Sequence, residues 1–94
     1  MELKAGFKIA VLNWKDVCKT VEFYRRSLNL SQRGLARILG VESTTVGVWE
    51  RGIKEPKASN LAKLAQVFGV SETDLLHPSA KVLKKIDKMN AKAP

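Results

Sequence analysis

The chain has 94 residues, of which 45% are hydrophobic, and this length and composition suit one small globular domain without room for a second core. Its 17 basic and 9 acidic residues give a net charge of +8, which favours a polyanionic partner over an acidic or neutral one. The sequence shows no paired carboxylates, no nucleophile beside a base and no spacing of metal ligands. We therefore expect no enzymatic activity, no catalytic residue, no cofactor and no metal site.

The first residues, 1–12, are predicted to form an arm. Residues 7–11 alternate apolar and other side chains, as a strand does. A helical stripe is also present, at Leu3, Phe7, Val11 and Trp14, so the pattern leaves both open. We expect the arm to pack either on its own domain or on a second subunit. The segment is too short to span a bilayer and carries no cleavage signature, so we expect a cytoplasmic protein with no membrane partner.

The single cysteine and the single histidine are both expected to be structural. Cys18 cannot form an intramolecular disulfide, and its place in an apolar stripe predicts a buried thiol. His77 precedes Pro78 and is expected to end a helix, because no second histidine is present to share a metal ion.

The predicted domain covers residues 13–78, and its first helix begins near Asn13. Asn13 and Asp16 have the spacing of a capping box, and Leu12 and Val17 that of a hydrophobic staple around it. The apolar stripe of this helix follows at helical spacing, at Val17, Val21, Tyr24 and Leu28.

Two short helices joined by a tight turn are predicted next. Ser31 is a good N-cap, and Gly40 can take the left-handed conformation that ends a helix. The second helix starts near Glu42. Its apolar face carries Val46 and Trp49, and its other face is small and polar, with Ser43, Thr44, Gly47 and Arg51.

Two further helices complete a core of five. One carries Leu61, Leu64, Ala65 and Phe68 and ends at Gly69. The last is short, opens on a capping box of Ser71 and Asp74, and ends before Pro78. The fold class predicted for the chain is therefore all-α.

Over residues 16–77 the chain resembles the lambda-repressor-like helix-turn-helix domains of the Cro/cI or Xre type. The residues that carry the resemblance are Arg25, Gln32, Leu35, Ala36, Gly40, Val41, Trp49, Glu50, Arg51, Gly52 and Pro56. The resemblance implies a five-helix DNA-binding domain whose second motif helix enters the major groove of double-stranded DNA.

The resemblance also implies a role for individual residues. Base-reading positions of relatives correspond here to Ser43, Thr44, Thr45 and Val48, although Val48 could instead pack in the core. Glu42 replaces the usual Ser or Thr at the helix start and could accept a hydrogen bond from a cytosine amino group. Positions that contact phosphates or the minor groove correspond to Gln32, Arg51, Lys54 and Lys57, although both lysines could simply be solvated.

The resemblance has two further consequences, one for an ion pair and one for two glycines. Arg25 and Glu50 correspond to a structural ion pair that sets the packing of the helices. Gly34 and Gly47 depart from the family pattern, since Gly34 stands where a helix former is usual and Gly47 lies inside the second motif helix. Each glycine costs about 0.5–1 kcal/mol of helix stability, and either could permit close approach to DNA.

The tail, residues 79–94, carries five lysines and one aspartate, so half of the net charge of +8 lies on it. Its apolar residues at positions 82, 83, 86 and 89 gather on one side, as in an amphipathic helix. Such a helix could pack on the core or on a dimer partner, strengthen DNA binding as a basic extension, or lie on an anionic membrane.

These features predict a sequence-specific transcriptional regulator, a repressor that acts as a homodimer on an operator. One alternative is the antitoxin of a toxin-antitoxin pair, with a toxin as its protein partner. Another is a protein-interaction module that uses the same fold with another regulator as its partner.

Overall fold

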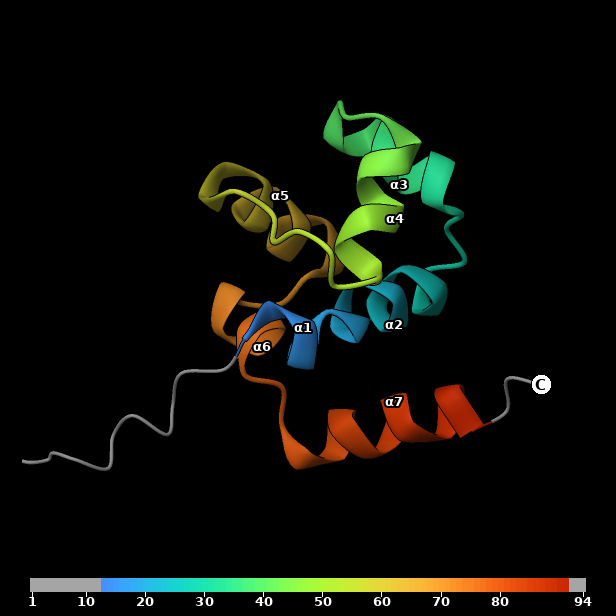
Figure 1. Ribbon diagram of the computed structural model, residues 1–94, viewed down its shortest axis with the longest axis vertical. Helices are drawn as coiled ribbons and strands as arrows, with labels where there is room; N and C mark the ends of the chain where they lie inside the picture. The colour runs from blue at the N-terminus through green and yellow to red at the C-terminus, as the bar shows by residue number, and fades with distance from the viewer. Residues whose placement is uncertain (1–12, 92–94) are drawn as a thin grey trace, which may run out of the picture.

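The computed structural model describes residues 13–91, and these residues form seven helices joined by short loops (Figure 1). In chain order the helices are α1 (Trp14–Val17), α2 (Lys19–Ser27), α3 (Gln32–Leu39), α4 (Ser43–Glu50), α5 (Ala58–Phe68), α6 (Glu72–Leu76) and α7 (Ala80–Ala91). The all-α prediction is confirmed for the described residues. The predicted arm, with its strand and helix alternatives, lies outside them.

The first predicted helix begins where expected but differs in its details. Asn13 is the N-cap of α1, yet its side chain makes no capping hydrogen bond, so the predicted capping box with Asp16 is wrong. The N–H of Asp16 donates instead to the backbone carbonyl of Asn13 at 2.9 Å. At Cys18 the helix is interrupted, which divides the predicted element into α1 and α2.

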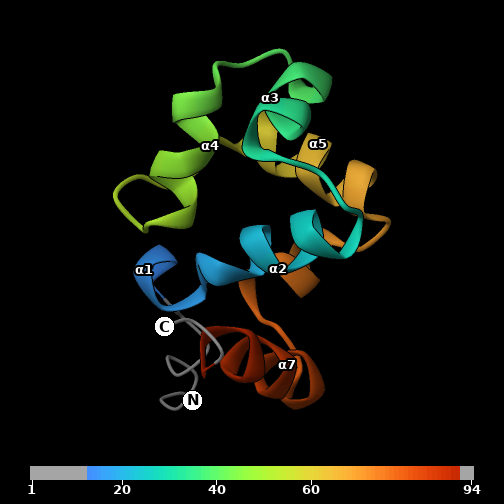
Figure 2. The same cartoon turned by 90° about the vertical axis from the view of Figure 1, so that its right-hand side faces the viewer.

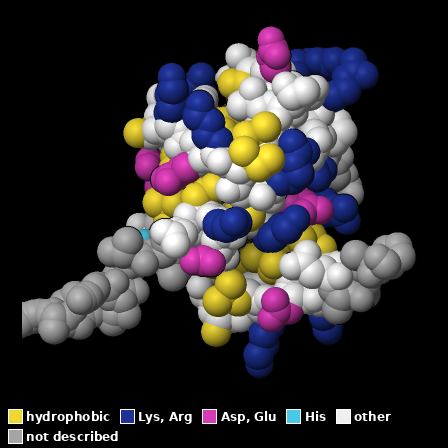
Figure 3. All heavy atoms as spheres, viewed as in Figure 1, with side chains coloured by type: hydrophobic (Ala, Val, Ile, Leu, Met, Phe, Trp, Pro, Cys, Tyr) yellow, Lys and Arg dark blue, Asp and Glu magenta, His cyan; other side chains and the backbone are white. Residues whose placement is uncertain are grey.

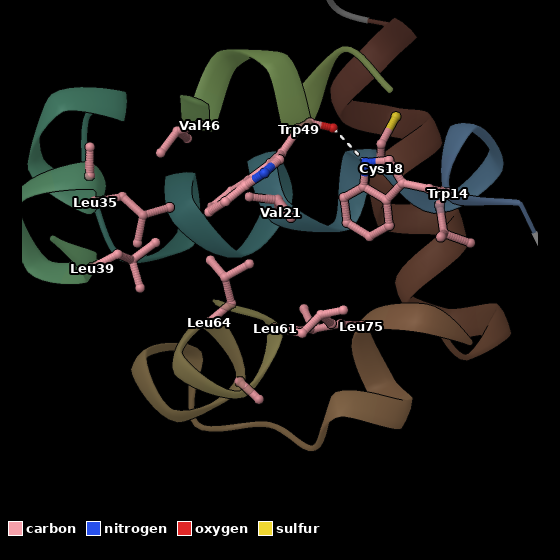
Figure 4. Packing of buried hydrophobic residues seen from close by; sticks show 13 residues of the cluster. Trp14, Cys18, Val21, Leu35, Leu39, Val46, Trp49, Leu61, Leu64 and Leu75 are labelled. Carbon is pink, nitrogen blue, oxygen red and sulfur yellow. Dashed lines mark hydrogen bonds between the residues drawn. The ribbon is translucent and has the colours of Figure 1, made fainter. Parts of the chain in front are cut away.

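One hydrophobic core joins α1 to α6 (Figure 4). Trp14 and Trp49 meet at its upper side, where the indole N–H of Trp14 donates to the backbone carbonyl of Trp49 at 2.8 Å. The one hydroxyl hydrogen of Thr20 has two acceptors within reach, the carbonyl of Val17 at 2.8 Å and the carbonyl of Leu75 at 3.1 Å, and the second contact connects α2 with α6. The other buried hydrophobic residues of the cluster are Val17, Cys18, Val21, Leu35, Ala36, Leu39, Val46, Leu61, Leu64 and Ala65.

The helix α7 packs on α2 from the side opposite to α4. Figures 1 and 2 both place α7 below α1 and α2, with α3 and α4 above them. Ile86 is buried, whereas Val82 and Met89 on the same side of the helix are half-buried. Of the three alternatives for the tail, the structure therefore shows packing on the core. In the part of the chain from 13 to 91, no helix combines the length and the apolar character needed to cross a bilayer.

The predicted capping box at the start of α6 is present. The hydroxyl of Ser71 accepts from the N–H of Asp74 at 3.0 Å, and the carboxylate of Asp74 accepts from the N–H of Ser71 at 3.2 Å. Because α6 has only five residues, these bonds pair a large share of its free N–H groups.

We expect Ser71→Ala to lower the free energy of unfolding by about 1 kcal/mol, because it removes the side-chain oxygen that caps α6. Urea unfolding followed by tryptophan fluorescence measures the change. Asn13→Ala is the matched control, since it also replaces an N-cap residue but removes no capping hydrogen bond, and it should change stability by less than about 0.5 kcal/mol. Equal losses of unfolding free energy in the two variants would contradict the role of the Ser71 side chain as the cap of α6.

Candidate functional site

The predicted pair of helices is formed by α3 and α4, and its turn has a local cause. The hydroxyl of Ser31 accepts from the N–H of Gly34 at 2.9 Å and caps α3. Gly40 ends α3 with φ of 76°, in the left-handed region that favours glycine. Glu42 is the extended N-cap residue of α4, which begins at Ser43 as the sequence predicts.

One face of α4 is held by the core. Val46 is fully buried, Trp49 is 3% exposed and Glu50 is 3% exposed. The carbonyl of Trp49 near the end of α4 receives the bond from Trp14 described above. These contacts fix α4 at both its middle and its end, so its opposite face keeps a defined orientation.

Glu50 is the centre of a buried polar network that joins three helices. Arg25 of α2 donates through Nε to Oε2 of Glu50 at 2.7 Å and through Nη2 to Oε1 at 3.1 Å. Gln32 of α3 donates through Nε2 to Oε1 of the same carboxylate at 3.0 Å. Nη1 of Arg25 also donates to the carbonyl of Leu30 at 2.8 Å, which ties down the chain that enters α3.

The electrostatics of this network match its geometry. The side chains of Arg25 and Glu50 are 11% and 4% exposed, so the ion pair predicted from the resemblance is present and largely removed from water. Hydrogen bonding to Glu50 raises the pKa of Arg25, an effect that burial opposes. A bidentate guanidinium–carboxylate pair fixes distance and angle together, so it orients α4 against α2.

Gly47 of α4 is buried beneath side chains of its neighbours, although the sequence places it on the small, polar face of the helix. A Cβ atom at this position would lie 3.3 Å from Nη1 of Arg51 and 3.5 Å from Oε1 of Gln32. The missing side chain therefore leaves the space in which Gln32 and Arg51 lie against the helix. The sequence identified Gly47 as a departure from the family pattern, but it gave no sign of these neighbours.

The predicted base-reading residues lie at the start of α4 and on the face of α4 that the core does not hold. Glu42 and Thr44 are exposed, and Ser43 and Thr45 are half-buried. Val48 is also half-buried, and it is not among the partly buried hydrophobic side chains that pack against the core cluster. This face presents hydroxyl and methyl groups close to the backbone of α4.

Basic side chains follow directly after α4. Arg51, Lys54 and Lys57 are all exposed, the first at the end of α4 and the last at the start of α5. Figure 3 shows Lys and Arg side chains spread over the face that contains α4. Gly52, with φ of 75°, lets this loop approach α1, because a Cβ there would lie 3.3 Å from Cα of Lys15 in α1.

The single cysteine and the single histidine lie at positions where they serve the fold. Cys18 is buried as predicted, and burial raises the pKa of its thiol. His77 ends α6, also as predicted. Residues 13–91 hold no group of three or more His, Cys, Asp or Glu side chains that could bind a metal ion.

Comparison with known proteins agrees with this geometry. A helix-turn-helix family model matches residues 21–75. The chain is 38% identical over 56 residues to the HTH-type transcriptional regulator DicA of Escherichia coli (strain K12), a match that covers 60% of this chain and 42% of DicA. The chain thus spans less than half the length of DicA.

Two further similarities cover more of the matching protein. An uncharacterized HTH-type transcriptional regulator of Methanocaldococcus jannaschii is 36% identical over 55 residues, which are 58% of this chain and 83% of that regulator. The crystal structure of the hypothetical transcription factor NHTF from Neisseria is similar with a TM-score of 0.67 and 30% sequence identity, over 79% of this chain and 85% of NHTF.

Proposed function

The chain belongs to the helix-turn-helix family of the Cro/cI-like, Xre type, and from this premise we propose that it is a transcriptional regulator that reads duplex DNA with α4. The observation that carries the proposal is the division of α4 into two faces. Val46, Trp49 and Glu50 lie on the buried face, while short polar side chains cover the other. A helix held on one side by a core and open on the other suits insertion into the major groove.

The base contacts come from the first turns of α4. The hydroxyls of Ser43 and Thr44 donate or accept hydrogen bonds at base edges, and the methyl group of Thr44 can meet a thymine methyl. Thr45 and Val48 flank these positions, and the exposed carboxylate of Glu42 can accept from a cytosine amino group. Short side chains require a close approach and make few bidentate contacts, so discrimination among sequences is modest.

The phosphate contacts surround α4. Nε2 of Gln32 carries two hydrogens, of which one is directed at Glu50, so the other is available to a phosphate oxygen. The first backbone N–H groups of α3 have no acceptor within that helix. Together with the positive end of the helix dipole, they favour a phosphate at the N-terminus of α3. Arg51, Lys54 and Lys57 add positive charge from the loop after α4.

We further propose that the regulator acts as a homodimer and represses transcription by occupying an operator. One copy offers a single helix of eight residues for base reading. Two copies on half-sites about 10 base pairs apart place two such helices in successive major grooves on the same side of the duplex. The added base contacts supply the specificity that one copy lacks.

Substitution of a base-reading residue should change sequence preference, whereas substitution of a phosphate-contacting lysine should change overall DNA affinity. Ser43→Ala or Thr44→Ala should relax the preference at particular base pairs, with a loss of about 0.5–1.5 kcal/mol of discrimination at those positions, the range for a single hydrogen bond. Lys54→Gln or Lys57→Gln should weaken binding to every sequence alike and lower the slope of log K against log salt by about 1 for each lysine. Fluorescence anisotropy of labelled duplexes over a salt series measures both. The same effect from both groups would contradict the assigned roles.

The proposal as a whole is tested by selecting bound duplexes from a random DNA library at about 150 mM salt, where non-specific binding is weak. We expect an inverted repeat with half-sites about 10 base pairs apart. Recovery of no motif would overturn base reading by α4 and indicate that this fold serves protein contact in this chain.

A further inference from the structure

A groove lies between α2 and α7 and is lined by side chains of both helices. Figure 2 shows α7 on the side of α2 that faces away from α4. The groove holds a volume of about 440 Å³ and is lined by Phe23 and Arg26 of α2 and by Lys85, Lys88 and Met89 of α7. The proposed contacts with DNA use none of these residues.

The lining combines an apolar floor with a basic edge. Phe23 and Met89 are half-buried and form the apolar part. The ring of Phe23 meets the ring of Tyr24 edge-on, with centroids 5.1 Å apart, which is a favourable geometry for an aromatic pair. Lys85 and Lys88 are exposed, and the side chain of Arg26 is 60% exposed.

The positive charge continues from the groove along α7. Lys81, Lys84, Lys85 and Lys88 are spaced so that they share one side of the helix, and none of them takes part in an ion pair among residues 13–91. Asp87, the one acidic residue of α7, lies on a different side of the helix. Like charges at this spacing repel one another, so a negatively charged partner relieves the repulsion.

We propose that the α2–α7 groove binds a segment of a partner protein in which acidic residues alternate with large apolar ones. The apolar side chains cover Phe23 and Met89, while the carboxylates pair with Lys85 and Lys88. A DNA backbone has the charge but no apolar group to cover the floor of the groove. Figures 1 and 2 place α4 and α7 on opposite sides of α2, so a duplex read by α4 would leave the groove open, and the groove would provide a second binding function beyond DNA recognition.

The test uses the full chain and two fluorescein-labelled peptides of about twelve residues. The first peptide alternates Glu and Asp with Leu and Phe, and the second keeps the acidic residues but has Ser in place of Leu and Phe. By anisotropy at 150 mM salt, the first peptide should bind about tenfold more tightly than the second, because only it covers the apolar floor. Amide shifts in NMR spectra should move at the groove residues. Equal binding of the two peptides would overturn the proposal in favour of a surface that attracts any polyanion.

Two matched variants locate the site. Lys85→Glu with Lys88→Glu reverses two charges in the groove, whereas Lys81→Glu with Lys84→Glu reverses two on the same helix outside its lining. The first variant should weaken binding of the Leu and Phe peptide about tenfold or more, and the second less than about threefold. Equal losses would show that only the overall charge matters and would overturn the proposal.

A duplex of about 20 base pairs serves as the third probe. The two variants should lower its affinity to the same small extent, because both change the net charge equally. A loss of duplex binding confined to Lys85→Glu with Lys88→Glu would overturn the proposal and identify the groove as a nucleic-acid site. The circular dichroism spectrum of each variant verifies that α7 is still folded.

Discussion

Arg25→Ala is expected to lower the free energy of unfolding by about 3–5 kcal/mol, because it leaves the carboxylate of Glu50 buried without its counter-charge. The side chain of Glu50 is 4% exposed, and after the substitution Gln32 is the one side chain among residues 13–91 that still donates to it. A native domain has a total stability of about 5–15 kcal/mol, so this single change removes a large part of it. Urea unfolding followed through the two buried tryptophans, Trp14 and Trp49, measures the loss.

The next residue in the chain supplies the control. Arg26 also forms an ion pair, with Glu22 at 3.0 Å, but its side chain is 60% exposed. Arg26→Ala should therefore cost less than about 1 kcal/mol. If Arg25→Ala costs no more than Arg26→Ala, the buried network does not hold α2, α3 and α4 together as described. Replacing Arg25 and Glu50 together by Met and Leu should cost less than Arg25→Ala alone, because no unpaired charge remains buried.

Gly47→Leu is expected to weaken binding to a selected operator duplex by tenfold to a hundredfold, which corresponds to about 1–3 kcal/mol. A leucine side chain would occupy the space in which Gln32 and Arg51 now lie, since even its Cβ would come within 3.3 Å of Arg51. The phosphate contacts proposed for Gln32 and Arg51 would then be lost. Titration of the labelled duplex by anisotropy measures the loss.

The same substitution should leave the fold intact. Leucine is a better helix former than glycine by about 0.8 kcal/mol, which partly offsets the loss of the hydrogen bond from Gln32 to Glu50. Arg25 still pairs with both oxygens of that carboxylate, so Glu50 keeps its counter-charge. Ala62→Leu is the matched control, because it adds a leucine to an exposed position of α5, and it should change neither stability nor DNA affinity appreciably. Undiminished DNA binding by Gly47→Leu would show that the space above Gly47 has no part in recognition.

The parts of the molecule that were predicted correctly have local causes. Ser31 caps α3 through a residue three positions away, and Gly40 ends the same helix through its own φ angle. The capping box of Ser71 and Asp74 also lies within one turn. Asn13 shows the limit of such reasoning, because its sequence context suits a capping box but its side chain makes no capping bond.

Sequence alone thus determined the helices α3 to α6, the tight turn between α3 and α4, and the face of α4 that is small and polar, because each depends on neighbouring residues. Tertiary structure decided which distant groups meet. The bond from Gln32 to Glu50 joins residues 18 positions apart, and the bond from Trp14 to Trp49 joins residues 35 positions apart. The packing of α7 on α2, and with it the groove beside Phe23, likewise follows from how the helices share one core. Spacing along the chain records the face on which a side chain lies, but only the packing of the helices brings it to its partner.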